Sequence, residues 1–237
     1  MGYFDAHRRN LLTSLVLVCP LFVIYQLGVL LTRPMLNGAD FVTIFLLHHL
    51  GLSTLAYLSF VGGVALAFVV AVAVLGRKQR FDRHVIIPVL LESTLYALTM
   101  GSLIVFVMTE VLGISPRLAG PGLLPAQSLL SRFVMSIGAG LYEELVFRLG
   151  LLSASVYVAE RVMGMRRFVA VLLGLAFSSF AFSAMHHIPP YGDPFSLGVF
   201  TFRILAGVFF ALLFWYRGFA VAVYTHALYD IYVLILR

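Results

Sequence analysis

Carboxylate, guanidinium and imidazole side chains interrupt three apolar stretches in the second half of the sequence. They are Glu143, Glu144 and Arg148 in the first stretch, His186 at the end of the second, and His226 and Asp230 in the third. Placing such an ionisable group inside a membrane-spanning helix costs about 2.5–3.5 kcal/mol on insertion scales. Each of these residues is therefore a candidate for function.

Two neighbouring glutamates begin the first of these groups. On a helix, Glu143 and Glu144 point about 100° apart, so only one of them can face a given site. Glu144 and Arg148 are spaced i,i+4 in the favourable order and are expected to pair. Glu143 is then left to face the interior of a bundle, where a carboxylate can act as a general base. The alternative is a purely structural ion pair with the second glutamate reaching the membrane surface.

Two histidines supply the other polar groups. His226 and Asp230 share a helix face, so the carboxylate can hold one imidazole nitrogen and leave the other for chemistry. His186 stands beside His187 at the end of an apolar run and, taken alone, is typical of an interfacial residue. Together with Glu143, however, the two imidazoles form a set that could carry out the attack of water on an amide, with a base for the water proton and donors for the oxyanion.

The elements that must position these residues are predicted to be transmembrane helices. Of the 237 residues, 62% are hydrophobic and 11% are charged, against roughly 25% charged in a soluble domain. We therefore predict an all-α polytopic bundle of about seven or eight spans, near 11–31, 53–75, 86–113, 129–159, 168–187, 197–216 and 219–236. The eighth span would arise if the long fourth stretch breaks near Gly138 or Gly140.

The basic residues fall in short loops rather than in a stripe, so we expect a lipid bilayer and no nucleic acid as partner. The basic loops alternate along the chain, which for seven spans predicts an inner N-terminus and an outer C-terminus. This orientation places Glu143, His186 and His226 in the outer half of the bilayer. It predicts a polar cavity that opens toward the outer face.

Three short motifs then carry a family resemblance. Residues 143–148 read EExxxR, residues 182–186 read FxxxH, and residues 226–230 read HxxxD. In this order, over roughly residues 129–236, the chain resembles the CAAX-protease and bacteriocin-processing family, which includes the Ras-converting endopeptidase. We accordingly divide the chain into N-terminal transmembrane helices of unassigned role, 1–126, and a protease core, 127–237.

The resemblance implies a glutamic-type intramembrane endopeptidase in which Glu143 activates water. His186, His226 and Asp230 would complete the catalytic set, and Glu144 and Arg148 would support it. An ionised aspartate can only accept hydrogen bonds, so Asp230 is expected to orient His226 rather than hold the oxyanion. The expected substrate is a membrane-associated or lipid-modified peptide or protein, and the expected location is a bacterial inner membrane. No cofactor and no metal is expected.

Two alternatives stay open from the sequence. A zinc-dependent protease could use His186 and His226 with Glu143 or Asp230 as ligands, although the chain has no HExxH motif and Arg148 would oppose the cation. A non-catalytic membrane protein, such as an immunity factor, a scaffold or a transporter, could use the same charges structurally or as a proton relay.

Overall fold

The computed structural model describes residues 10–32, 54–115, 128–188 and 193–236, and it is helical without a strand over these ranges. The first half contains α2 (Leu11–Thr32), α4 (Thr54–Gly76), the 3-10 turn η2 (Arg83–Val85), α5 (Ile86–Phe106) and its π-helical end η3 (Val107–Val111). The second half contains α6 (Leu129–Gly138), the π-helical η5 (Ala139–Leu152), α7 (Ser153–Tyr157), η6 (Val158–Val162), α8 (Arg167–Met185), α9 (Leu197–Arg217), α10 (Phe219–Ile231) and η7 (Tyr232–Leu236).

Helical segments stand at all seven predicted positions, and the all-helical class is confirmed. By length and hydropathy, five segments of the described chain can cross a membrane: Leu11–Val29, Arg83–Val111, Arg167–Met185, Leu197–Arg217 and Phe219–Leu236. The described part of α4 includes a shorter apolar helix, Val61–Gly76, and the stretch from α6 to η6 carries the charges of the first motif. A total of seven or eight spans therefore stays a prediction.

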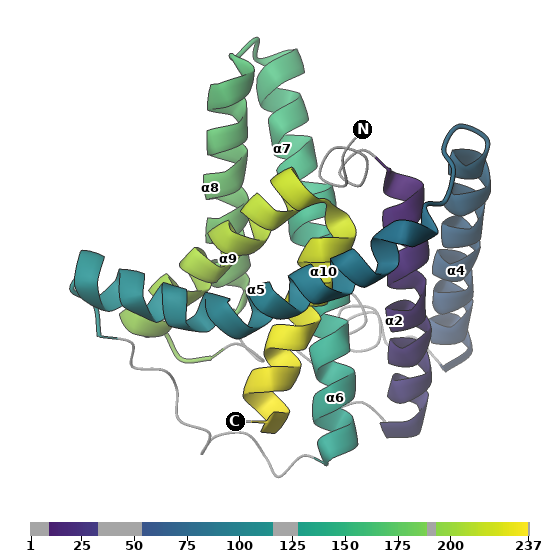
Figure 1. The fold of residues 1–237 in the computed structure, drawn as a ribbon, viewed down its shortest axis with the longest axis horizontal. Coiled ribbons are helices and arrows are strands. Elements are labelled where there is room, and N and C mark those ends of the chain that lie inside the picture. The colour runs from purple at the N-terminus through teal and green to yellow at the C-terminus, as the bar shows by residue number, and fades with distance from the viewer. Residues whose placement is uncertain (1–9, 33–53, 116–127, 189–192, 237) are drawn as a thin grey trace.

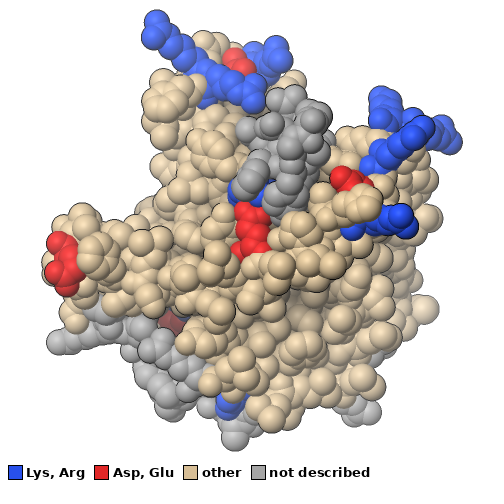
Figure 2. Space-filling view, in the orientation of Figure 1, with Lys and Arg blue, Asp and Glu red and all other residues tan. Residues whose placement is uncertain are grey.

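Helices α2, α4, α7 and α8 run between two ends of the molecule (Figure 1). One end carries the turn between α7 and α8 and the loop between α4 and α5. Figure 2 shows most of the visible lysine and arginine side chains gathered at this end. A cluster of cations at one end of a helical bundle is the pattern expected of the cytoplasmic side of a membrane protein.

The long fourth stretch does not break at its glycines. The backbone stays helical through Gly138 and Gly140 and changes there from α to the wider π winding. A Cβ at Gly140 would lie 2.6 Å from the backbone nitrogen of Ala227, so only glycine lets η5 approach α10 this closely. This approach brings the first motif against the third.

Helix α10 occupies the centre of the bundle and contacts α2, α5, α6, α9 and η5. Its residues Ala220, Val221, Ala222 and Val223 are fully buried. Helix α5 crosses the front of the bundle at a steep angle to α2 and α6 (Figure 1). A bidentate ion pair between Glu92 and Arg217 connects it to the end of α9. The Tyr96 hydroxyl also donates a hydrogen bond to Glu92, at 3.0 Å.

Candidate active site

Glu143 projects from η5 into a space between two histidines that come from two other helices. Its Oε1 lies 3.4 Å from Nε2 of His186 at the end of α8. Its Oε2 lies 3.7 Å from Nε2 of His226 in the middle of α10. The glutamate is only 3% exposed, and Oε2 forms no hydrogen bond. The structure thus brings together the carboxylate and the two imidazoles that the sequence predicted.

Glu144 points to the other side of the same turn and holds two partners. Its Oε2 lies 3.2 Å from Nε of Arg148, and both side chains are fully buried. The pair predicted from the i,i+4 spacing is therefore present. Its Oε1 lies 2.8 Å from Nδ1 of His226, a contact that the sequence did not reveal.

Arg148 is enclosed by groups from α8 and α9. Its guanidinium donates to the Gly207 carbonyl at 3.2 Å and lies 4.4 Å from the ring centre of Phe182 and 5.5 Å from that of Phe210. Gly207 leaves room for this packing, because a Cβ there would lie 3.0 Å from the Cα of Ser179. Arg148 thus packs between Glu144 and the rings of Phe182 and Phe210.

His186 is held by the backbone of its own helix. Its Nδ1 lies 2.8 Å from the Phe182 carbonyl. A carbonyl can only accept, so this nitrogen carries the hydrogen. The side chain is 24% exposed, which makes it the more accessible of the two histidines that face Glu143.

His226 is oriented by Glu144 rather than by Asp230. A carboxylate paired with an arginine can only accept hydrogen bonds, so Nδ1 of His226 is the donor to Glu144. Asp230 lies on the other side of the ring, with Oδ2 3.8 Å from Nε2. The imidazole also stacks on Phe210, with ring centres 4.3 Å apart and planes inclined by 14°. The expectation that Asp230 fixes this tautomer is therefore corrected: Glu144 holds Nδ1, and Asp230 lies near Nε2.

Both histidines consequently present the same nitrogen to Glu143. Each Nδ1 is committed as a donor, and each Nε2 faces the carboxylate. Because Nε2 of a neutral ring with hydrogen on Nδ1 can only accept, it becomes a donor when the ring is an imidazolium. The distances from Glu143 to the two Nε2 atoms, 3.4 and 3.7 Å, are also compatible with a water molecule that bridges the carboxylate and an imidazole. The arrangement can accept a proton from water at Glu143 and donate hydrogen bonds from a charged imidazole.

His187 lies outside this group, as its adjacency to His186 predicted. Its Nδ1 lies 3.0 Å from the Asp193 carbonyl, and its ring packs on Phe195 and Phe200. The sequence also gave no role to the aromatic neighbours Phe182 and Phe210. An i,i+4 spacing before His186 was the available signal for Phe182, whereas no local pattern connects Phe210 to His226.

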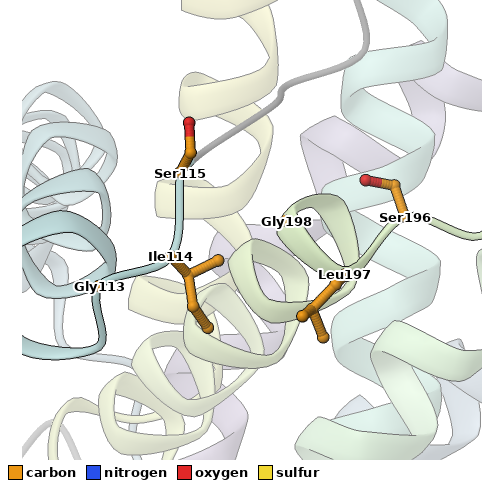
Figure 3. A pocket seen from close by; sticks show the side chains of 6 residues that line it. All are labelled: Gly113, Ile114, Ser115, Ser196, Leu197 and Gly198. Carbon is orange, nitrogen blue, oxygen red and sulfur yellow. The ribbon is translucent and has the colours of Figure 1, made fainter.

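Two further features of the described residues concern metal binding and a cleft. No group of three or more His, Cys, Asp or Glu side chains is arranged to hold a metal ion among the residues that the structure describes. A cleft between the residues that follow η3 and the start of α9 is lined by Gly113, Ile114, Ser115, Ser196, Leu197 and Gly198 (Figure 3). None of these lining residues belongs to the three motifs.

Comparison with known families agrees with the motifs. Residues 125–232 match the family model described as type II CAAX prenyl endopeptidase Rce1-like. The matched segment is a little under half of the chain and contains all three motifs. Neither the curated proteins nor the solved structures include a match to the chain.

Proposed function

We propose that this multi-pass membrane protein is a glutamic-type intramembrane endopeptidase, because residues 125–232 match the Rce1-like type II CAAX prenyl endopeptidase family model. The observation that carries the proposal is the position of Glu143. Its carboxylate is buried between two imidazole Nε2 atoms, while the neighbouring Glu144 is occupied by Arg148 and His226. Glu143 is thus the carboxylate free to act on water.

In the proposed reaction, Glu143 takes a proton from a water molecule as the water oxygen attacks the carbonyl carbon of the scissile bond. The negative charge on the carbonyl oxygen is stabilised by an Nε2–H group of His186 or His226 in the imidazolium form. The carbon–nitrogen bond then breaks, and the proton held by Glu143 passes to the leaving amine. Glu144 and Arg148 support this set by holding the ring of His226, and Asp230 stabilises the charged ring electrostatically.

The proposed substrate class is supported by the family match and by the apolar outer faces of the helices. We propose a membrane-associated or lipid-modified peptide, with a prenylated C-terminal tail as the first class to test. The apolar faces of the described helices, which include Leu66, Phe106 and Phe177, are suited to contact with lipid. We propose a bacterial inner membrane as the location.

The decisive experiment compares the parent protein with Glu143→Gln. We expect the variant to insert and fold but to lose about 10²–10⁴-fold in cleavage rate, the usual contribution of a positioned general base. Cleavage is followed by proteomics of membrane-protein termini in cells and by an internally quenched prenylated peptide in detergent. Glu160→Gln is the matched control, because Glu160 lies on the same helical stretch, 4.0 Å from Arg167 and away from the site.

Retention of full activity by Glu143→Gln would end the proposal. A biological effect that survives in this variant without cleavage would instead favour a non-catalytic role. A chelator separates the zinc alternative, because the proposed reaction proceeds at an unchanged rate after chelation and the zinc reaction stops.

A further inference from the structure

Arg203 lies on the face of α9 that borders the candidate site. It precedes Gly207 by one helical turn and Phe210 by about two, and side chains at these spacings share a face. Gly207 accepts the hydrogen bond from Arg148, and Phe210 stacks on His226. Arg203 also interacts electrostatically with Asp230. Arg203 therefore lies on the side of α9 that faces the candidate site.

Asp193 connects Arg203 to His186. Its Oδ2 lies 2.5 Å from Nη2 of Arg203, and its backbone N–H donates to the His186 carbonyl at 2.8 Å. The backbone carbonyl of Asp193 accepts a hydrogen bond from Nδ1 of His187. The ion pair thus stands beside a histidine that faces Glu143.

The arginine has donors that Asp193 does not use. Nη1 of Arg203 is buried and forms no hydrogen bond, although a guanidinium can bind a carboxylate through two parallel N–H groups. The side chain of Asp193 is 49% exposed, whereas that of Arg203 is 23% exposed. An ion pair open to water contributes little stability, so the carboxylate of Asp193 is easily replaced. Arg148, the other arginine of this site, is committed to Glu144.

We propose that Arg203 binds a carboxylate of the substrate close to the scissile bond, and that this carboxylate displaces Asp193. The proposal rests on the proposed function and adds a requirement on the substrate. The carboxylate can come from a free C-terminus or from an acidic side chain. Arg203 would fix how far from that carboxylate the chain is cut.

The test measures binding, so that it does not depend on cleavage. The protein is Glu143→Gln in detergent, and the probe is a fluorescent prenylated CAAX peptide, read by anisotropy. Three forms are compared: a free C-terminal carboxylate, a C-terminal amide, and an amide with glutamate in the last position. We expect the free acid to bind about ten-fold more tightly than the amide, the effect of one charge-assisted hydrogen bond.

Substitution then assigns the preference to the arginine. Arg203→Gln should bind acid and amide equally, Arg203→Lys should restore part of the preference, and Asp193→Asn should bind the acid more tightly because the competing carboxylate is gone. A purely structural ion pair would instead make Asp193→Asn bind more weakly. Arg167→Gln, an exposed arginine at the opposite end, should leave all values unchanged.

The outcomes separate the two sources and the two proposals. Tight binding of the acid alone identifies a C-terminal carboxylate, and recovery by the glutamate amide identifies a side chain. Equal affinity for all three forms, no binding of any form, or a preference that survives in Arg203→Gln would overturn this inference. None of these results bears on whether Glu143 is the base, which the cleavage assay decides.

Discussion

Replacing Arg148 with alanine is expected to destabilise the protein by about 3–5 kcal/mol, the usual effect of removing one partner of a buried ion pair. Arg148 and Glu144 are both fully buried, and their nearest charged atoms are 3.2 Å apart. At an effective dielectric constant of about 20, two unit charges at this distance attract by about 5 kcal/mol. The variant leaves Glu144 buried with only the hydrogen bond from His226.

Other losses place the effect in the upper part of this range. Alanine also removes the hydrogen bond to the Gly207 carbonyl and the guanidinium that lies 4.4 Å from the ring centre of Phe182. A desolvated cation over an aromatic ring contributes about 2 kcal/mol or more. Part of the lost contact is recovered as neighbouring side chains relax into the space.

The assay is unfolding in mixed micelles with increasing SDS, followed by tryptophan fluorescence. The chain has one tryptophan, Trp215, which packs against the hydrophobic cluster formed by η5, α7, η6, α8 and α9. The double variant Glu144→Gln/Arg148→Met is the control, because it removes both charges and keeps an acceptor for His226. We expect it to be clearly more stable than Arg148→Ala. The reasoning is refuted if Arg148→Ala unfolds like the parent, or if the double variant is no more stable than the single one.

Three further predictions use the same structure. Alanine at either histidine that faces Glu143 should remove most cleavage activity per folded molecule, whereas His187→Ala should keep most of it; an essential His187 would shift the second motif by one residue. Gly140→Ala should lower activity at least ten-fold by separating η5 from α10, while Gly62→Ala, which has no atom within 4 Å of an added Cβ, should behave like the parent in both activity and unfolding. Pro194→Cys, made together with Cys19→Ala so that it is the single cysteine of the protein, should react with a membrane-impermeant thiol reagent in intact cells, since the N-terminus is predicted inside; labelling only after lysis would invert the orientation.

The positions of the helices could be predicted because the bilayer imposes a simple rule. A segment that crosses hydrocarbon must satisfy its own backbone and present apolar side chains, so hydropathy and length reveal it locally. The predicted stretch 11–31 corresponds to α2 at Leu11–Thr32, and 197–216 corresponds to α9 at Leu197–Arg217. The ion pair of Glu144 with Arg148 was equally local, because the i,i+4 spacing of a helix brings these side chains together.

Contacts between distant segments could not be predicted in this way. Glu92 interrupts the apolar sequence of α5, but no local spacing connects it to its partner Arg217, 125 residues away. It assigned Asp230 to orient His226, since four residues separate them. The structure gives that role to Glu144, 82 residues away, because Gly140 lets η5 pack directly on α10.

By itself, then, the sequence determined the helical class, the places of the helices and the residues that we propose for the chemistry, because each of these depends on apolar length, spacing and residue type along one segment. The tertiary structure alone decided which nitrogen of each histidine faces Glu143, which carboxylate holds His226, and that Arg203 stands beside His186. Those relations depend on the rotation and the separation of packed helices. Side chains of several segments set both of these together, and no spacing within one segment encodes them.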